Sequence, residues 1–167
     1  MVNILDKVQP KNKAQLAQLI YYAFKHNIYD LNFIDTSKIT DMFWLFRYKD
    51  YNFDVSSWDV SNVTNMSAMF YYCKNFDCDL SNWDVSNVTN TAGMFYYCKK
   101  FDCDLSCWNV SNVTYMEYMF TGCEKFNCDL SDWDISNIIH WRNMFSRCDK
   151  ITIPNWYKKL YIIKNKI

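Results

Sequence analysis

The chain has 167 residues, of which 50% are hydrophobic and 19% aromatic, and its 18 acidic residues balance its 18 basic ones. This balance leaves no basic surplus to neutralise a phosphate backbone, so we expect no nucleic-acid partner. No stretch approaches the ~20 apolar residues of a membrane span, and the first residues lack the apolar run and cleavage site of a signal peptide. We therefore expect an intracellular protein without a membrane span, while a surface or virion location stays open.

The first 33 residues are expected to form an N-terminal capping segment. Asn12 followed by Gln15 is typical of a capping box, and it predicts a helix over residues 12–26. The apolar residues of this segment follow the spacing of one helical face, at Leu16, Leu19, Ile20, Ala23 and Phe24. This face would cover the first unit of the chain that follows.

An internal repeat occupies most of the remaining chain. Tryptophan recurs every 25 residues, at Trp58, Trp83, Trp108 and Trp133. Residues 58–82 and 83–107 are identical at 20 of 25 positions. A period of this length predicts stacked units, because one unit cannot bury its apolar face alone. Allowing for degraded end copies, we expect five units and a C-terminal cap, over residues 34–57, 58–82, 83–107, 108–132 and 133–153, and then 154–167.

Each unit contains two hydrophobic patterns. The first follows one face of a short helix, with Thr64 as its cap, and comprises Val63, Met66, Met69, Phe70 and Cys73. The second alternates as in a half-buried strand, with Phe76, Cys78 and Leu80 inward and Asp77 and Asp79 outward. Successive strands would lie parallel and be joined by right-handed crossovers. The predicted fold class is α/β, a right-handed solenoid of about five 25-residue coils with parallel short strands and a helical N-terminal cap.

The repeated unit FDCDLSNWDVSNVTNMSAMFYYC resembles the BspA-like leucine-rich-repeat family of bacterial surface proteins and lipoproteins. The segment from Asp30 to Ser37, followed by Ile39-Thr40-Asp41-Met42, is similar to the lead-in before such repeats. The resemblance implies a leucine-rich-repeat-like solenoid that binds other proteins, often host or matrix components, without catalytic residues. The chain departs from the family in carrying cysteine at positions 78, 103 and 128 and in lacking an export signal.

Seven of the eight cysteines fall into two columns of the repeat, Cys73, Cys98, Cys123 and Cys148, and Cys78, Cys103 and Cys128. Their Cys-x4-Cys spacing is unlike the closer pairs, such as Cys-x-x-Cys, that zinc prefers. Free cysteine is among the most buried residue types, so a reduced ladder that fills core space is the favoured interpretation. We therefore expect no metal and no cofactor. The alternative is a thiol-based metal or redox module.

Two columns of polar residues are expected to face outward, Asn52, Asp77, Asp102 and Asn127, and Asp54, Asp79, Asp104 and Asp129. Adjacent carboxylates repel one another, so their presence calls for a cation, a basic partner or local hydrogen bonds. Asp79 is placed to accept the amides of the Ser81-Asn82 turn, which would make the column structural. A calcium site is disfavoured, because an Asp-x-Asp pair on a strand offers too few oxygen ligands.

Four tyrosines form an aromatic-rich edge, Tyr71, Tyr72, Tyr96 and Tyr97. Exposed tyrosine is a favoured contact residue, so this edge would serve a partner or self-association. The alternative is that these rings pack against neighbouring coils.

Catalysis is not expected. Histidine occurs only at positions 26 and 140, and Gly93 and Gly122 are isolated rather than part of a phosphate-binding loop. We predict a non-catalytic repeat scaffold that mediates protein–protein interaction. The candidate binding residues are Asp54, Asp77, Asp79, Asp102, Asp104, Asn127, Asp129, Tyr71, Tyr72, Tyr96 and Tyr97. The alternative is a structural or assembly component, for example of a virion, that uses the same surfaces for fixed subunit contacts.

Overall fold

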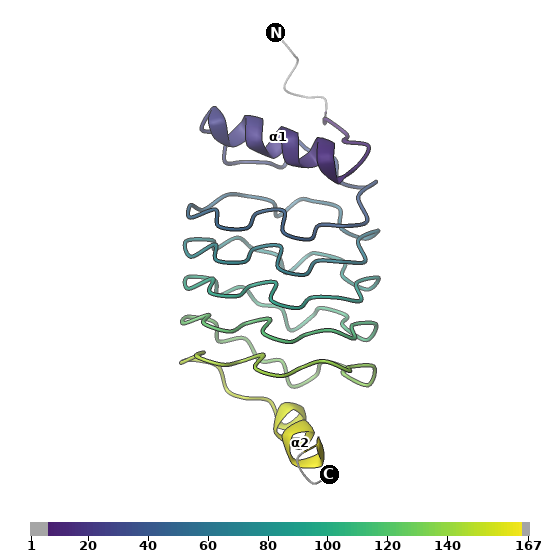
Figure 1. Ribbon diagram of the computed structural model, residues 1–167, viewed down its shortest axis with the longest axis vertical. Coiled ribbons are helices and arrows are strands. Elements are labelled where there is room, and N and C mark those ends of the chain that lie inside the picture. Colours follow the sequence, from purple (N-terminus) through teal and green to yellow (C-terminus); the bar gives the residue numbers. More distant parts are fainter. Residues whose placement is uncertain (1–6, 165–167) are drawn as a thin grey trace.

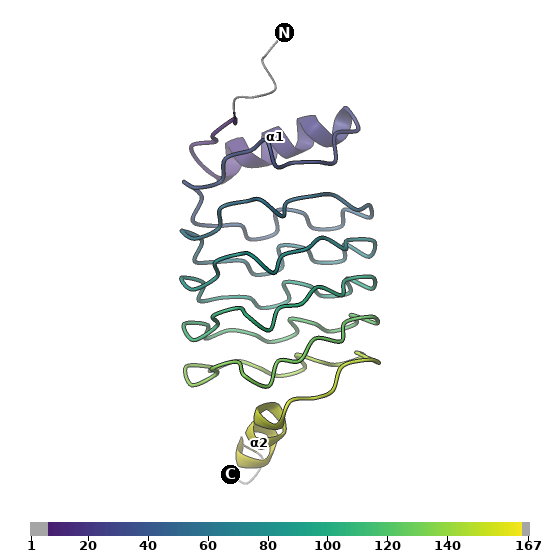
Figure 2. The ribbon, with the colours of Figure 1, turned by 180° about the vertical axis from the view of Figure 1, so that it is seen from behind.

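The computed structural model describes residues 7–164. It consists of a stack of irregular coils with one helix at each end, α1 (Lys13–Lys25) and α2 (Asn155–Lys164) (Figure 1; Figure 2). Within residues 7–164 there is no strand, and isolated parallel bridges connect successive coils through Asp41, Asn65, Asn90, Tyr115 and His140. The predicted α/β leucine-rich-repeat-like solenoid of parallel strands is therefore wrong.

The segment expected to be a helix consists of consecutive turns. The amides of Met69, Tyr71 and Cys73 each donate to the carbonyl three residues earlier, at 2.9–3.2 Å. The amides between them donate instead to the next coil; for example, Phe70 N lies 2.9 Å from Met94 O. Ala68 has φ +52° and Tyr72 has φ +60°, so a left-handed residue every fourth position prevents an α-helix. The turns still bring the apolar stripe inward.

Thr64 was expected to cap that helix, and it connects two coils instead. Its amide donates to Thr40 O at 2.9 Å, and its hydroxyl lies 3.2 Å from the same oxygen. Thr89 and Thr114 make the equivalent pair of bonds, each to the threonine one coil earlier.

The segment expected to be a strand also lacks a backbone ladder, because side chains take its amides. The amide of Asp77 donates to Oδ1 of Asn52 at 2.9 Å, and that of Leu80 donates to Sγ of Cys103 at 3.1 Å. The inward and outward alternation is nevertheless present, since Phe76, Cys78 and Leu80 are buried while residues 77 and 79 are exposed.

The core consists of the same side chain stacked on itself from coil to coil. The rings of Phe70 and Phe95 lie 5.6 Å apart with 7° between their planes, and Phe95 and Phe120 repeat this arrangement at 5.6 Å and 8°. Phe46 and Phe145 extend the column to the first and last coils. Stacking of this kind removes both faces of each ring from water, so the interior is continuous along the axis.

Tryptophan connects each coil to the one before it. The indole N–H donates to a carbonyl oxygen of the preceding coil at 3.0–3.2 Å, in the pairs Trp58–Leu31, Trp83–Val55, Trp108–Leu80 and Trp133–Leu105. Trp156, in α2, makes the same bond to Leu130 O at 2.8 Å. The last helix thus supplies the tryptophan that another coil would have supplied.

Cysteine makes a second set of bonds from each coil to the preceding one. The thiol lies 2.8–3.0 Å from a phenylalanine carbonyl of the preceding coil, in the pairs Cys73–Phe46, Cys98–Phe70, Cys123–Phe95 and Cys148–Phe120. All eight cysteines are free thiols in the structure. Burial raises the pKa of Cys73 to about 12, so the thiol stays protonated and acts as a donor.

The two helices cover the ends of the stack. In α1, Asn12 Oδ1 accepts the amide of Gln15 at 3.0 Å, and Leu16, Ile20 and Ala23 are buried against the first coil. In α2, Tyr157 packs edge-on against Phe145 of the last coil at 5.0 Å. The predicted boundaries of the five units and of the caps stay predictions, and the outermost residues of both caps lie outside the described residues.

The Trp156 bond yields a stability test. Trp156→Phe keeps an aromatic ring but removes the indole donor, so the carbonyl of Leu130 keeps only the longer bond of 3.3 Å from the Trp133 amide. We expect unfolding to become easier by about 0.5–1.5 kcal/mol, the net contribution of one hydrogen bond. Urea denaturation measures this change. Trp44→Phe is the control, because the Trp44 side chain is 46% exposed. Equal stability of the two variants would contradict the role assigned to α2.

Candidate functional site

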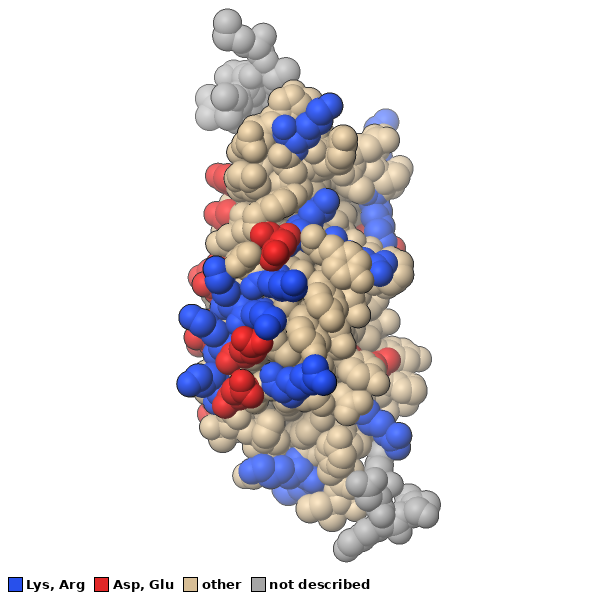
Figure 3. Space-filling model, turned by 60° about the vertical axis from the view of Figure 1, so that its left-hand side comes forward, with Lys and Arg blue, Asp and Glu red and all other residues tan. Residues whose placement is uncertain are grey.

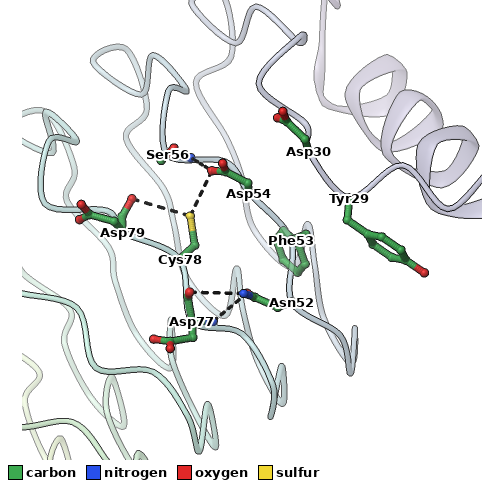
Figure 4. A pocket seen from close by; sticks show the side chains of 9 residues that line it. All are labelled: Tyr29, Asp30, Asn52, Phe53, Asp54, Ser56, Asp77, Cys78 and Asp79. Atoms are coloured by element: carbon green, nitrogen blue, oxygen red, sulfur yellow. Dashed lines mark hydrogen bonds between the residues drawn. The ribbon is translucent and has the colours of Figure 1, made fainter.

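Three adjoining hollows run along the face formed by the segments around residues 52–56, 77–81 and 102–106. Their volumes are about 430, 450 and 290 Å³. The first two share Asp77, Cys78 and Asp79, so they are continuous, and the next pair shares residues 102–104. Figure 4 shows the first hollow from close by. We call this surface the acidic groove, after its carboxylates Asp30, Asp54, Asp77, Asp79, Asp102, Asp104 and Asp129.

A local turn fixes one column of these aspartates. In each Asp-x-Ser sequence the aspartate Oδ1 accepts the serine amide at 2.8–3.0 Å, in the pairs Asp54–Ser56, Asp79–Ser81, Asp104–Ser106 and Asp129–Ser131. This is an Asx turn, in which a carboxylate replaces a backbone acceptor. The local hydrogen bond that the sequence suggested for Asp79 is therefore present. It uses one carboxylate oxygen, and in Asp79, Asp104 and Asp129 the described residues place no hydrogen bond on the second.

The turns also set the acidity of these groups. Hydrogen bonds from Ser81 lower the pKa of Asp79, although the neighbouring charge of Asp104 raises it to a smaller extent. Burial raises the pKa of Asp54, but hydrogen bonds from Ser56, Asn32 and Cys78 together bring it below its ordinary value. The column is consequently held in its charged form at neutral pH, despite the repulsion between coils.

The cysteines on the floor of the groove connect aspartates of adjacent coils. Cys78 Sγ lies 3.6 Å from Asp54 Oδ1, a contact drawn in Figure 4, and Cys103 Sγ lies 3.5 Å from Asp79 Oδ1. Burial raises the pKa of Cys78 to about 12 and that of Cys103 to about 11. A thiol of such low acidity is a poor nucleophile at neutral pH, so these cysteines act as hydrogen-bond partners.

The second predicted column lies in the same groove. Asn52 Oδ1 accepts the amide of Asp77, and Asp102 Oδ1 accepts the amide of Asn127 at 3.0 Å. All seven polar candidates from the sequence therefore line one continuous surface. The sequence analysis missed Tyr29 and Asp30, which extend the groove toward α1. The likeness of Asp30-Leu31-Asn32 to Asp54-Val55-Ser56 was the available signal, since the structure pairs Asp30 with Asp54.

The charge of the groove is of one sign. Among the residues that line its three hollows there is no lysine or arginine. Elsewhere the surface is mixed, and Figure 3 shows a flank on which basic side chains gather with acidic ones among them. Lys99 and Glu124 form an ion pair of 2.6 Å. The groove is thus a concentrated acidic strip on a chain whose formal net charge is zero.

The four predicted tyrosines lie together on a second surface, which shares no lining residue with the groove. Tyr71 stacks on Tyr96 at 4.7 Å with 4° between the planes, and Tyr72 stacks on Tyr97 at 4.9 Å and 1°. The rings pack on neighbouring coils, and Tyr71 also borders a surface hollow, while contact with a partner stays a prediction. We call this surface the aromatic ledge, and it comprises Trp44, Tyr48, Tyr71, Tyr72, Tyr96, Tyr97 and Tyr118.

Three members of the ledge were missed in the sequence. Trp44, Tyr48 and Tyr118 occupy the left-handed positions of their coils, with φ of 60°, 61° and 60°. Aligning the first coil with the second places Trp44 beside Ala68 and Tyr48 beside Tyr72, which was the signal available. The ledge therefore begins one coil earlier and ends one coil later than the Tyr-Tyr pairs indicate.

The two histidines take part in ring contacts. His26 lies 4.1 Å from the ring of Tyr22, with Nδ1 2.8 Å from the Tyr22 carbonyl oxygen, and His140 stacks on Tyr115 at 4.8 Å. Across residues 7–164, no group of three or more His, Cys, Asp or Glu side chains is placed to hold a metal ion.

The helices of the described chain are too short and too polar to cross a membrane.

Comparison with known families matches residues 14–112 and 82–161 to the family described as "Mycoplasma protein of unknown function, DUF285". The two matches overlap and together cover most of the chain. The chain belongs to this family. Two overlapping matches are what a repeated sequence produces, and the membership agrees with the repeat-family resemblance at that coarse level. No curated protein and no solved structure matches the chain.

The Asx turns predict the pH dependence of stability. The pKa values of Asp79, Asp104 and Asp129 lie below the ordinary value of 3.8 because of hydrogen bonds from the serine two residues later. The unfolded chain therefore takes up protons first, and stability falls as the pH drops below 3.8 and through the folded pKa values. Above that window the contribution of these groups is constant.

Urea unfolding between pH 7 and pH 2 measures this dependence. Asp79→Asn keeps an oxygen acceptor for the Ser81 amide and removes the titrating group, so its decline on acidification is expected to be shallower than that of the unaltered chain. Stability that increases on acidification would show that repulsion within the column outweighs the turn hydrogen bonds.

Proposed function

We propose that this protein is a non-catalytic repeat scaffold that binds a basic segment of a partner protein along the acidic groove. The observation that carries the proposal is the continuous row of carboxylates, with no lysine or arginine among the residues that line it. An unbroken strip of one charge attracts an oppositely charged partner and disfavours others. The same strip repels phosphate, so it supports a protein partner over a nucleic acid.

The groove is also ready to bind without rearrangement. Each Asp-x-Ser turn fixes its carboxylate through one oxygen and leaves the other for a partner, as in Asp79 and Asp104. Fixed side chains lose little conformational freedom on binding, which favours affinity. A cationic side chain placed between coils would also relieve the repulsion that raises the pKa of Asp79.

The family resemblance supports the class of function. The repeated unit resembles BspA-like surface proteins, and in that family the repeats bind proteins without catalysis. Membership of the DUF285 family is compatible with this role but assigns no partner. The partner is therefore defined by its chemistry alone, as a chain segment rich in lysine or arginine.

A charge-neutralising triple variant tests the groove. The probe is a synthetic peptide of alternating arginine and serine, and binding is measured by fluorescence anisotropy at low and at physiological salt. Asp79→Asn, Asp104→Asn and Asp129→Asn together keep the turns but remove three charges, so we expect binding to weaken about tenfold or more, within the range that electrostatic focusing in a cleft provides.

The chain offers a matched control for this experiment. Asp59, Asp84 and Asp134 form the same Asp-x-Ser turn but line none of the three hollows of the groove. Changing these three to asparagine alters the net charge equally, and at physiological salt binding is expected to weaken much less than in the groove variant, since screening by salt reduces the effect of charges outside the groove. If both triple variants weaken binding to the same degree, the peptide responds to overall charge and the groove is not the site.

A further inference from the structure

The aromatic ledge contains a hollow of about 540 Å³ in the middle of the stack. Tyr71 and Tyr96 stand in parallel along one side, and the ring of Tyr118 lies 6.3 Å from that of Tyr96 at 75°. Small residues, Ala68, Ala92 and Gly93, line the hollow between these rings. The space therefore has aromatic walls on two sides.

Gly93 keeps this hollow open. The equivalent position holds Ala68 in the preceding coil and Tyr118 in the following one, with φ of 52° and 60°, so the fold accepts side chains there. A Cβ on Gly93 would lie 3.8 Å from Cδ2 of Tyr71, which is ordinary contact. A longer side chain would therefore enter the space beside the tyrosines, and glycine leaves that space for another occupant.

The remaining member of the lining is acidic. Glu117 is placed by its carbonyl, which accepts the amide of Gly93 at 2.8 Å, and its side chain borders the hollow. Its Oε2 atom is buried and has no hydrogen-bond partner among the described residues. The ion pairs found within residues 7–164 are Lys13–Asp41 and Lys99–Glu124, and neither involves Glu117. A buried carboxylate oxygen without a donor is unfavourable, so this site calls for a cation.

The chain's own arginines show how this ledge receives a cation. The guanidinium of Arg47 lies 4.1 Å from the ring centre of Trp44, 4.6 Å from that of Tyr48 and 5.9 Å from that of Tyr71. In the last coil, Arg147 Nη1 donates to the hydroxyl of Tyr97. Both ends of the ledge thus hold a guanidinium, whereas the residues that line the hollow between them include no lysine or arginine.

We propose that the hollow binds an arginine side chain of a partner protein. The guanidinium packs among the rings of Tyr71, Tyr96 and Tyr118, and its N–H groups donate to the carboxylate of Glu117. Arginine suits the site better than lysine, because its planar group stacks on aromatic rings and bonds a carboxylate through two donors. The inference does not depend on the acidic groove, since the two surfaces share no lining residue.

Amide NMR tests the site directly on the full chain. The chain has two glycines, Gly93 in the hollow and Gly122 against Tyr97 outside its lining, so their amide signals give a reporter and an internal reference. The probe is N-acetyl-arginine amide, and the neutral isostere N-acetyl-citrulline amide is the matched control. We expect a saturable shift of the Gly93 signal with the arginine probe and little change at Gly122. Equal shifts with both probes, or no shift, would overturn the proposal.

Three variants locate the contact. Glu117→Gln removes the charge and is expected to weaken binding at least about tenfold, as loss of a buried charge partner does, whereas Glu124→Gln, outside the hollow, leaves it unchanged. Ala92→Arg places a guanidinium at the position one coil before Glu117 and is expected to abolish binding while raising the melting temperature. Unchanged binding in the folded Glu117→Gln variant would overturn the proposal.

A variant of Arg142 tests whether this arginine, rather than a partner's, binds the carboxylate of Glu117. It borders, together with Glu117, a neighbouring hollow of about 450 Å³, and the two side chains form no ion pair in the structure. We expect Arg142→Gln to bind the arginine probe as the unaltered chain does. Binding that appears only in this variant would mean that Arg142 itself occupies the carboxylate of Glu117 in solution, and the proposal would be wrong.

Discussion

The structure depends on polar side chains that donate hydrogen bonds into the backbone of the preceding coil. The tryptophan indole reaches a leucine or valine carbonyl, the cysteine thiol a phenylalanine carbonyl, and the asparagine amide a serine carbonyl, as in Trp83, Cys98 and Asn87. The carbonyls of Val55 and Phe70 also accept an amide of their own coil, so the side-chain donor adds the bond that joins one coil to the next. Each of these positions is therefore constrained by its neighbour. These bonds, together with the alternate backbone amides that donate to the next coil, connect the coils in place of a β-ladder. They also explain why these residue types recur in the unit.

The sequence reveals the inward-facing residues better than it reveals the backbone. Met66, Met69, Phe70 and Cys73 are all fully buried, as their spacing predicts. A turn of four residues with one left-handed member brings the same positions inward as a helix of 3.6 residues per turn. The distinction lies in the φ angle of Ala68 and Tyr72, and neither alanine nor tyrosine signals a left-handed conformation in the way that glycine does. The helix prediction failed for this reason.

The two surfaces differ in how far the sequence predicts them. The aspartate columns follow from the period alone, because side chains 25 residues apart align whatever backbone carries them. The hollow on the ledge does not follow from the period, since it arises where the units differ. Gly93, Glu117 and Tyr118 replace residues of another kind in the neighbouring coils, and only the folded chain shows that these three exceptions meet in one place. The period thus determines the scaffold, and the departures from it create a specific site.

The tryptophan of α2 bears on how the number of coils can change in evolution. Trp156 contacts the carbonyl of Leu130, and leucine occupies the equivalent place in the two preceding coils, at positions 80 and 105. The terminal helix consequently recognises a feature that most coils share, and its docking does not depend on how many coils come before it. Duplication or deletion of a whole 25-residue unit by genetic recombination would leave both ends of the protein intact. The length of the acidic groove is therefore a heritable variable that can change in a single step.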